Sequence, residues 1–300
     1  MKQAVLLLAH GAPERVEDVD SYLSYVRGGR PGSPHVVEEV RQRYAAIGGS
    51  SPLLAWTKHQ AAALGDFLGI QVFFGMRNWH PFIAETMDQV REAGIERLAA
   101  ICLTPQFSEV SVGLYIRRTE EARQWAGVQA EIVWAKSFYD EPLLIEAFAE
   151  RLAPLVGQAL GLPKVLFTAH SVPEKAVANG DPYDKEARAT ADAVARRVGL
   201  NDWGFAYQSQ GMTDERWMGP TVEAYLEGYA SEGVREVVVD PIGFVSDHVE
   251  VLYDIDILFK GYAAERGITL TRPESLNGSP AFTRALAEVA KRCFEDRKKT

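Results

Sequence analysis

Short apolar runs alternate with amphipathic stretches along nearly the whole chain. The runs span roughly four to eight residues and are bounded by polar or turn-forming residues, a pattern typical of buried strands. Strands are predicted at Ala4–Ala9, Ile70–Gly75, Leu98–Leu103, Glu131–Ala135, Val165–Ala169, Gly204–Gln208, Val234–Asp240 and Ile268–Arg272. Helices are predicted between them, at Thr57–Leu68, Pro81–Ala93, Ser111–Trp125, Pro142–Leu160, Asp184–Val198 and Pro220–Ser231.

This alternation predicts an α/β fold. Strands separated by helices form parallel sheets through right-handed crossovers. Four strands fall in each half, so we expect two doubly wound sheets, one in residues 1–137 and one in residues 138–278. The first half carries a long insertion at about 20–56, which we expect to form a lid or wall of a pocket. Residues 279–300 are expected to form a closing helix that packs back on the first half.

One short phrase occurs twice. Leu8–Pro13 and Thr168–Pro173 each follow an apolar run, and each places Ala-His before a Pro three residues after the His. Such a phrase presents an imidazole at the carboxyl edge of a sheet, which is where open α/β sheets bind ligands. His10 and His170 are therefore expected to face one cleft from two similar halves.

Composition narrows the class of protein. With 47% hydrophobic and 24% charged residues, the 300-residue chain is globular rather than disordered. The net charge of −9 argues against non-specific nucleic-acid binding. No apolar run reaches the ~18 residues of a membrane span, and the N-terminus leads directly into a strand, so we expect a cytoplasmic protein without a signal peptide. The two cysteines, Cys102 and Cys293, are too few for an iron–sulfur cluster.

The densest group of polar residues follows the strand that ends at Asp240. If this segment is helical, Asp247, Glu250 and Asp254 fall at i, i+3 and i+7 and form a carboxylate stripe about 10 Å long. Such a stripe is often only a solvated face, but its place at the carboxyl end of a strand favours a functional role. His170 and Glu250 together suit either a divalent ion such as Fe²⁺, Co²⁺ or Zn²⁺ or a proton abstraction.

Eight strings in the chain resemble the signature motifs of the ferrochelatase family, in order and with fitting gaps. They are IGGSSPL (47–53), GMRNWHP (75–81), LTPQFS (103–108), FTAHSVPE (167–174), GDPY (180–183), QSQ (208–210), WMGP (217–220) and PIGFVSDHVEVLYD (241–254). The resemblance implies a chelatase-like fold of two Rossmann-like domains with four-stranded parallel sheets and a tetrapyrrole cleft between them. The implied activity is insertion of Fe²⁺ into a porphyrin with release of two pyrrole protons.

The resemblance also implies roles for individual residues. His170 and Glu250 are expected to form the metal-site pair and to act in catalysis, with Asp247 and Asp254 along the path of the metal. Around the tetrapyrrole, the short bacterial enzymes use positions that correspond to Arg27, Arg43, Tyr44, Ser51 and Tyr115. Arginine suits the propionates of a porphyrin because it can bind a carboxylate with two hydrogen bonds. An exposed helix charge remains an equally good interpretation of Arg43.

His10 departs from the pattern of the Gram-positive, coproporphyrin-specific enzymes, which have a Tyr there. It is a possible ligand of product iron, or it only hydrogen-bonds the Gly11–Pro13 turn. The chain also lacks an obvious apolar lip and a cysteine-rich C-terminal extension, so the resemblance favours coproporphyrin III as substrate over protoporphyrin IX. A sirohydrochlorin-type chelatase and a non-catalytic haem or metal carrier are the weaker alternatives.

The partners expected from the resemblance are the porphyrin and Fe²⁺, the latter as substrate and not as a prosthetic group. We expect no resident cofactor, no nucleic acid and no stable membrane insertion. Transient contact with neighbouring enzymes of the haem pathway is a further expectation.

Overall fold

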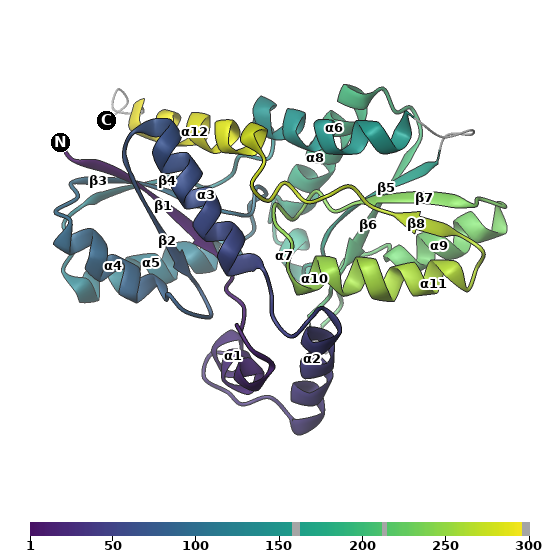
Figure 1. The fold of residues 1–300 in the computed structure, drawn as a ribbon, viewed down its shortest axis with the longest axis horizontal. Coiled ribbons are helices and arrows are strands. Elements are labelled where there is room, and N and C mark those ends of the chain that lie inside the picture. The colour runs from purple at the N-terminus through teal and green to yellow at the C-terminus, as the bar shows by residue number, and fades with distance from the viewer. Residues whose placement is uncertain (158–162, 212–214, 296–300) are drawn as a thin grey trace.

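Two parallel four-stranded sheets lie side by side in the computed structural model of the chain, which describes residues 1–157, 163–211 and 215–295 (Figure 1). The strand order is β2-β1-β3-β4 in the first sheet and β6-β5-β7-β8 in the second. The two orders are equivalent when the second half is renumbered from its own first strand. The predicted α/β class, with two Rossmann-like four-stranded halves, is confirmed.

The first half begins with a strand and carries its insertion directly after it. Its elements are β1 (Gln3–Ala9), η1 (Val16–Asp18), α1 (Val19–Val26), α2 (Pro34–Ala46), α3 (Leu53–Leu68), β2 (Gln71–Met76), α4 (Ile83–Glu92), β3 (Arg97–Cys102), α5 (Val112–Ala126) and β4 (Glu131–Ala135). The second half contains α6 (Pro142–Val156), β5 (Lys164–His170), α7 (Glu174–Ala178), α8 (Tyr183–Val198), β6 (Trp203–Gln208), α9 (Val222–Ser231), β7 (Glu236–Asp240), α10 (Val249–Leu252), η2 (Asp254–Phe259), α11 (Lys260–Ala264), β8 (Thr269–Thr271) and α12 (Pro280–Glu295).

The layers follow from the alternation of side chains along each strand. In β1, Val5 and Leu7 point to one face of the sheet, while Leu6 and Leu8 point to the other. The first face is covered by α3 and α12, and the second by α4 and α5 (Figure 1). Because both faces are covered, β1 is almost wholly apolar, as is usual for strands of parallel sheets.

One apolar layer runs through both halves. It contains Val5 and Leu7 of the first sheet, Phe167 and Phe205 of the second, and buried side chains of α3, α6, α8 and α12. The opposite face of the second sheet has a separate core under α9, η2 and α11. The shared layer holds the two sheets in a fixed relation, and this relation determines how their carboxyl edges face each other.

Helix α12 is central to that shared layer. It packs on α3, β3 and β4 of the first half and on α6 of the second. The buried Arg97 donates to the carbonyl oxygens of Cys293 and Phe294 (3.1 and 3.0 Å), and so satisfies the last turn of α12. Two predicted helix ends lie outside the described residues: residues 296–300 of the expected closing helix, and the end at Leu160 of the helix predicted at Pro142–Leu160.

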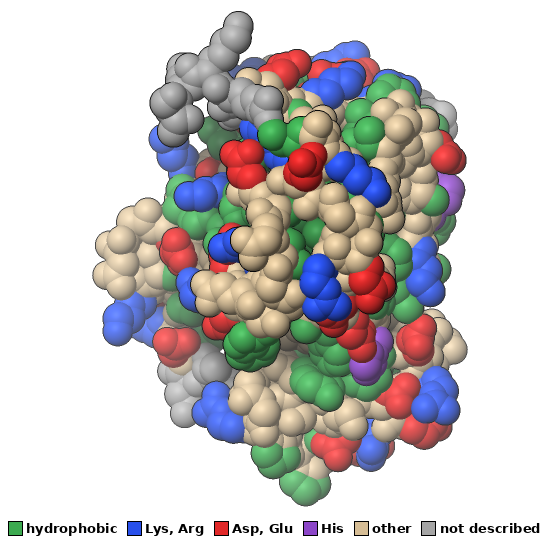
Figure 2. All heavy atoms as spheres, turned by 90° about the vertical axis from the view of Figure 1, so that its left-hand side faces the viewer, with side chains coloured by type: hydrophobic (Ala, Val, Ile, Leu, Met, Phe, Trp, Pro, Cys, Tyr) green, Lys and Arg blue, Asp and Glu red, His purple; other side chains and the backbone are tan. Residues whose placement is uncertain are grey.

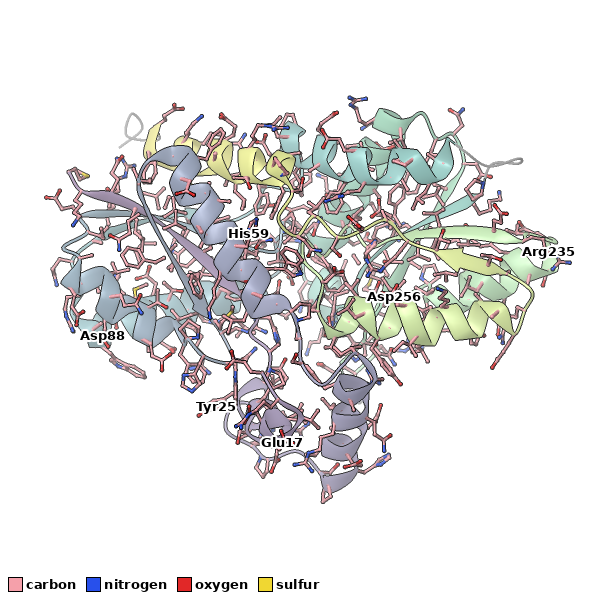
Figure 3. The ribbon with its side chains drawn as sticks, in the orientation of Figure 1. Glu17, Tyr25, His59, Asp88, Arg235 and Asp256 are labelled. Carbon is pink, nitrogen blue, oxygen red and sulfur yellow. The ribbon has the colours of Figure 1, made fainter. Side chains whose placement is uncertain are left out.

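Buried glutamines cross between the halves. Gln60 of α3 donates to Ser246 Oγ (2.9 Å) and to the carbonyl oxygen of Asn277 (2.8 Å). Gln106 donates to Thr190 Oγ1 (3.1 Å). Near the first of these bridges, His59 lies between the halves (Figure 3), and a Cβ at Gly278 would come within 2.6 Å of its ring. The glycine therefore permits the close approach of α3 to the segment before α12.

The segment between β1 and α3, here called the β1–α3 insertion, projects from the body of the molecule (Figure 1). Its helices α1 and α2 enclose a small core of Val19, Leu23, Val37 and Tyr44 with Trp79. Within the described ranges, no helix has the length and apolar character that crossing a membrane requires. On the face drawn in Figure 2, basic and acidic side chains are interspersed.

Asp240 is a charged residue type placed in the core. It ends β7, is 1% exposed, and its Oδ2 has no hydrogen-bond partner among the described residues. Burial raises the pKa of Asp240 to about 8, so the folded protein holds it largely as the neutral acid at neutral pH.

This burial predicts a pH dependence of stability. The folded pKa of Asp240 lies above its unfolded value of about 3.9, so the folded state binds the proton more tightly. The contribution to stability is therefore full below about pH 4 and is lost as the pH rises towards 8, at up to about 1.4 kcal/mol per pH unit. Asp240→Asn is expected to remove this slope, measured by urea unfolding between pH 5 and 8.

Asp66→Asn, at an exposed position on α3, is the matched control and is expected to keep the slope of the parent protein. Parallel curves of stability against pH for Asp240→Asn and the parent would contradict a neutral Asp240.

Candidate active site

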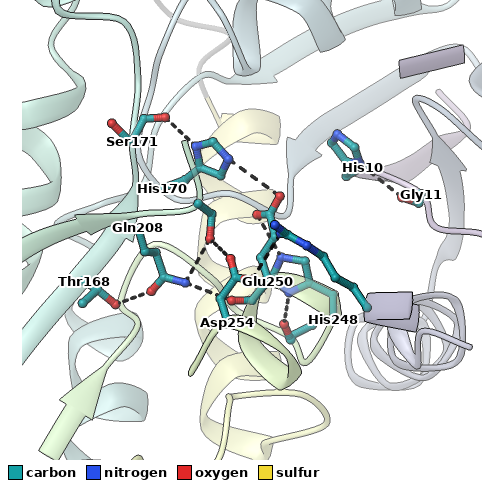
Figure 4. A network of polar contacts seen from close by, with 12 residues as sticks. His10, Gly11, Thr168, His170, Ser171, Gln208, His248, Glu250 and Asp254 are labelled. Carbon is teal, nitrogen blue, oxygen red and sulfur yellow. Dashed lines mark hydrogen bonds and ion pairs between the residues drawn. The ribbon is translucent and has the colours of Figure 1, made fainter. Parts of the chain in front are cut away.

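A cavity of about 430 Å³ opens between the two halves, at the carboxyl ends of both central strands. The two repeated phrases meet here, since His10 follows β1, His170 ends β5, and both line the cavity. Figure 4 shows His10 facing the group formed by His170, Glu250 and His248. The predicted convergence of the two histidines on one cleft is therefore observed. Apolar side chains supply much of the remaining wall, among them Leu53, Val172 and Trp217.

His170 is held with one ring nitrogen turned towards a carboxylate. Its Nδ1 donates to the carbonyl oxygen of Ser171, and its Nε2 lies 3.7 Å from Oε1 of Glu250. Burial alone lowers the pKa of His170, but the Glu250 carboxylate more than offsets this, and the net pKa is raised above the usual value. The hydrogen bond to Ser171 reserves Nε2 for a partner in the cavity.

Glu250 lies between two imidazoles. Its Oε2 is 3.6 Å from Nε2 of His248, while its Oε1 faces His170. Burial raises the pKa of Glu250, but the two histidines outweigh burial and hold it well below the usual value. Gln208 fixes the backbone here by donating to the carbonyl oxygen of Glu250 (2.9 Å). The Glu250 carboxylate is thus ionised, and it can attract a proton or a metal ion on either of its two oxygens.

His248 is a site residue that the sequence analysis missed. It precedes α10 with extended backbone angles (φ −159°, ψ −177°), and its Nδ1 contacts the carbonyl oxygen of Ser246 at 3.0 Å. In a continuous helix, residues two apart point in nearly opposite directions, which separated His248 from Glu250 in the predicted arrangement. The sequence feature that could have identified His248 is its position only two residues before Glu250.

The predicted carboxylate stripe is wrong at Asp247, because the helix begins only after His248. The Asp247 carboxylate accepts hydrogen bonds from Ser275 (2.8 Å) and Asn277 (2.7 Å) and pairs with Arg272 at 3.2 Å. It is therefore committed to the segment after β8 and is not among the residues that line the cavity.

Asp254 lies behind Glu250 at the start of the π-helix η2. Its carboxylate accepts a hydrogen bond from Ser209 and lies 3.6 Å from Nη1 of Arg43, a residue of α2. Burial raises the pKa of Asp254 to about 6, close to neutrality. Arg43 also pairs with Glu39 of the same helix (2.7 Å), and its contact with Asp254 connects the β1–α3 insertion to the acidic side of the site.

His10 is tied to its surroundings by three contacts. Its Nδ1 lies 3.1 Å from the carbonyl oxygen of Gly11 and 3.2 Å from the hydroxyl of Tyr22, and its Nε2 lies 3.1 Å from Nδ2 of Asn78. Burial and the charge of Arg77 lower the pKa of His10 to about 3, so the ring is neutral. The next residue, Gly11, has φ +85° and lies so close to Trp79 that a Cβ would come within 2.8 Å of its backbone nitrogen.

Of the five residues predicted around the substrate, two line the cavity and three do not. Tyr44 and Tyr115 line the cavity. Arg27, Arg43 and Ser51 are not among its lining residues. Arg27 directly follows α1, and Ser51 Oγ accepts from the backbone nitrogen of Leu53 (3.3 Å) at the start of α3.

Arg77 was not predicted, yet it lines the cavity and lies over the ring of Tyr115 at 4.8 Å. The sequence feature that could have identified Arg77 is its position directly after the strand β2.

His170 and Glu250 form the donor set of the cavity. In the ranges that the structure describes, no group of three or more His, Cys, Asp or Glu side chains is arranged to hold a metal ion. His170 and Glu250 offer one nitrogen and one carboxylate, which are ligands for a borderline divalent ion, next to an open cavity. Base, anion and cavity together can bind a cation and accept protons from a molecule lying against them.

Comparisons with known proteins agree with this chemistry. A family model described as Ferrochelatase matches residues 2–293. The ferrochelatase of Acidobacterium capsulatum is 47% identical over 308 residues, covering 96% of this chain and 94% of the relative. The coproporphyrin III ferrochelatase of Anoxybacillus flavithermus is 38% identical, over 95% of this chain and 94% of the relative. The solved structure of SirB from Bacillus subtilis with Fe³⁺ has a TM-score of 0.63 at 12% identity, covers 98% of this chain and 96% of that one, and supports the fold.

The contacts of Asp247 predict a structural effect of its substitution. Asp247→Asn removes the charge opposite Arg272 and turns one of the two carboxylate acceptors into a donor, so the hydrogen bonds from Ser275 and Asn277 cannot both be kept unchanged. We expect unfolding free energy, measured in urea, to fall by about 1–3 kcal/mol. The Michaelis constant for the metal should stay close to that of the parent protein. Unchanged stability together with a raised Michaelis constant would instead support the expected place of Asp247 on the path of the metal.

Proposed function

The chain belongs to the ferrochelatase family, whose reaction inserts Fe²⁺ into a porphyrin, and we propose that its porphyrin is coproporphyrin III. The ferrochelatase activity follows from the family, and the paired His170 and Glu250 beside the cavity are the observation that fits it best. Support for the substrate comes from several relatives at 36–38% identity that are named coproporphyrin III ferrochelatases. The relative at 47% identity is named ferrochelatase without a stated porphyrin, so protoporphyrin IX is the rival.

The polar groups of the cavity also favour a substrate rich in carboxylates. Arg77 supplies a cation, and Tyr22 and Tyr115 supply hydroxyls that burial keeps protonated by raising their pKa values. Coproporphyrin III carries four propionates, and a larger number of carboxylates needs more such partners than protoporphyrin IX does. Arg27, Arg43 and Ser51 remain proposed contacts for these propionates, supported by their places on the β1–α3 insertion.

We assign the proton chemistry to His170. Metal insertion requires two pyrrole protons to leave the ring, so a base must face it. The Nδ1 bond to Ser171 leaves Nε2 as the only ring nitrogen that can accept a proton from the cavity. Glu250, 3.7 Å from that nitrogen, stabilises the imidazolium that forms, as a carboxylate does for a catalytic histidine.

We assign the arriving metal to Glu250 first. Its pKa is held low, so the carboxylate is ionised and available to Fe²⁺. A cation bound at Glu250 also lowers the pKa of His170. His170 therefore loses its proton when the metal arrives, and its Nε2 can then accept a pyrrole proton. Asp254 remains a proposed station on the path, supported by its place behind Glu250 and its pKa near 6.

We further propose that His10 ligates the iron of the product from the opposite side of the ring. Its neutral imidazole faces the His170 and Glu250 group across the cavity (Figure 4), which supports this role. The contact of Nδ1 with Gly11 supports the alternative, in which His10 holds the turn after β1. Both contacts can coexist, because they use different ring nitrogens.

Competition between the two porphyrins tests the proposed substrate. With Fe²⁺ supplied anaerobically and both porphyrins at equal concentration, we expect coproporphyrin III to be metallated at least ten-fold more efficiently, measured as kcat/KM from product absorbance. Equal values, or a preference for protoporphyrin IX, would overturn the proposed substrate while leaving the activity itself intact.

Replacement of His170 tests the proposed base. His170→Ala should fold as the parent does and lose about 10²–10⁴ in turnover, the loss typical of a missing general base. His35→Ala, at an exposed position on α2, is the matched control and should retain the parent activity. Turnover of His170→Ala within a few-fold of the parent would rule out His170 as the base.

A further inference from the structure

The contacts of His10 determine which of its nitrogens carries the proton. The carbonyl oxygen of Gly11 can only accept, so Nδ1, 3.1 Å away, must be the donor. The hydroxyl of Tyr22, 3.2 Å from the same nitrogen, can accept as well. A neutral imidazole carries one N–H, and the lone pair therefore resides on Nε2. The opposite tautomer would place a lone pair against the oxygen of Gly11.

This tautomer leaves Nε2 as the only nitrogen able to bind a metal, and that nitrogen already has a partner. Nδ2 of Asn78 lies 3.1 Å from Nε2 and donates to its lone pair. The amide must present its NH₂ group here, since its oxygen would face another acceptor. In this arrangement the hydrogen bond from Asn78 occupies the lone pair that a bond to iron would need.

Asn78 is held firmly in this position. Its backbone nitrogen donates to the carbonyl oxygen of His10 (3.0 Å), and the preceding Arg77 donates to that of Ala9 (2.9 Å). The residue is 6% exposed, and Trp79 beside it belongs to the small core of the β1–α3 insertion. The backbone thus fixes the amide and the imidazole relative to each other, and only rotation of a side chain can separate them.

We propose that Asn78 is a positioning residue that competes with the iron of the metallated porphyrin for Nε2 of His10. The hydrogen bond must break before His10 can ligate, so Asn78 weakens ligation and speeds release of the product. An ordinary hydrogen bond of this kind changes an equilibrium by about five-fold. The inference rests on the proposed role of His10 as a product ligand.

Substitutions of Asn78 with opposite chemistry test this inference. Asn78→Leu keeps the size of the side chain and removes the donor, so Nε2 is free and ligation should strengthen. Asn78→Asp presents only acceptors, so Nε2 must carry a proton and ligation should be lost. Iron(III) coproporphyrin III is bound to each protein without turnover. Its visible spectrum and its rate of transfer to a haem-scavenging apoprotein are then measured.

We expect Asn78→Leu to release the iron porphyrin about five-fold more slowly than the parent and to show more of the nitrogen-ligated spectrum. Asn78→Asp should release it faster, with the spectrum of His10→Ala. In the His10→Ala background, both substitutions at Asn78 should have no further effect, because the nitrogen on which they act is gone.

A purely structural role for Asn78 predicts a different result. General loosening of the loop would speed release in both variants, and that outcome would overturn the inference, as would spectra and rates equal to those of the parent. An effect of Asn78→Leu that persists in the His10→Ala background would overturn it too. Failure of the parent to bind iron coproporphyrin III at all would instead refute the proposed function on which the inference rests.

Discussion

The apolar layer shared by the two halves is the constraint on which the active site depends. Val5 and Leu7 of β1 and Phe167 of β5 belong to this one layer, under helices drawn from both halves. His10 follows β1 and His170 ends β5, and both histidines line the cavity. Shifting one sheet against the other would require repacking α12, which packs on β3 and β4 of the first half and on α6 of the second. The separation of His10 and His170 is therefore set by burial of apolar surface far from the chemistry.

Charge at the site is balanced locally. Burying the carboxylate of Glu250 would be unfavourable by itself, but imidazoles at 3.6 and 3.7 Å offset that cost. On the opposite side, burial and the charge of Arg77 keep His10 neutral by lowering its pKa. The cavity thus has one side able to take up protons and cations, and another whose imidazole stays uncharged. This asymmetry suits a substrate that exchanges two protons for a divalent cation.

Much of this arrangement could be predicted from the sequence, because buried strands appear there as short apolar runs. The eight strands, their division into two halves and the meeting of His10 and His170 were predicted from apolar runs and repeated phrases. The segment around Glu250 was not, because spacing alone assumes a regular helix. The extended backbone at His248 and the π-helix after it depend on tertiary contacts such as those of Asp247 with Asn277. Arg77 was missed because no periodicity distinguishes a cation that faces a cavity.

The hydrogen bonds of two buried glutamines between the halves restrict how a large ligand can reach the cavity. Gln60 and Gln106 are buried, and each donates hydrogen bonds from one half to the other. Opening the molecule like a book would break these bonds and leave their partners unsatisfied in an apolar interior. A broad, stiff disc such as a porphyrin must therefore enter and leave while the two halves stay joined. The frame around the reacting centre therefore keeps its shape while the disc passes.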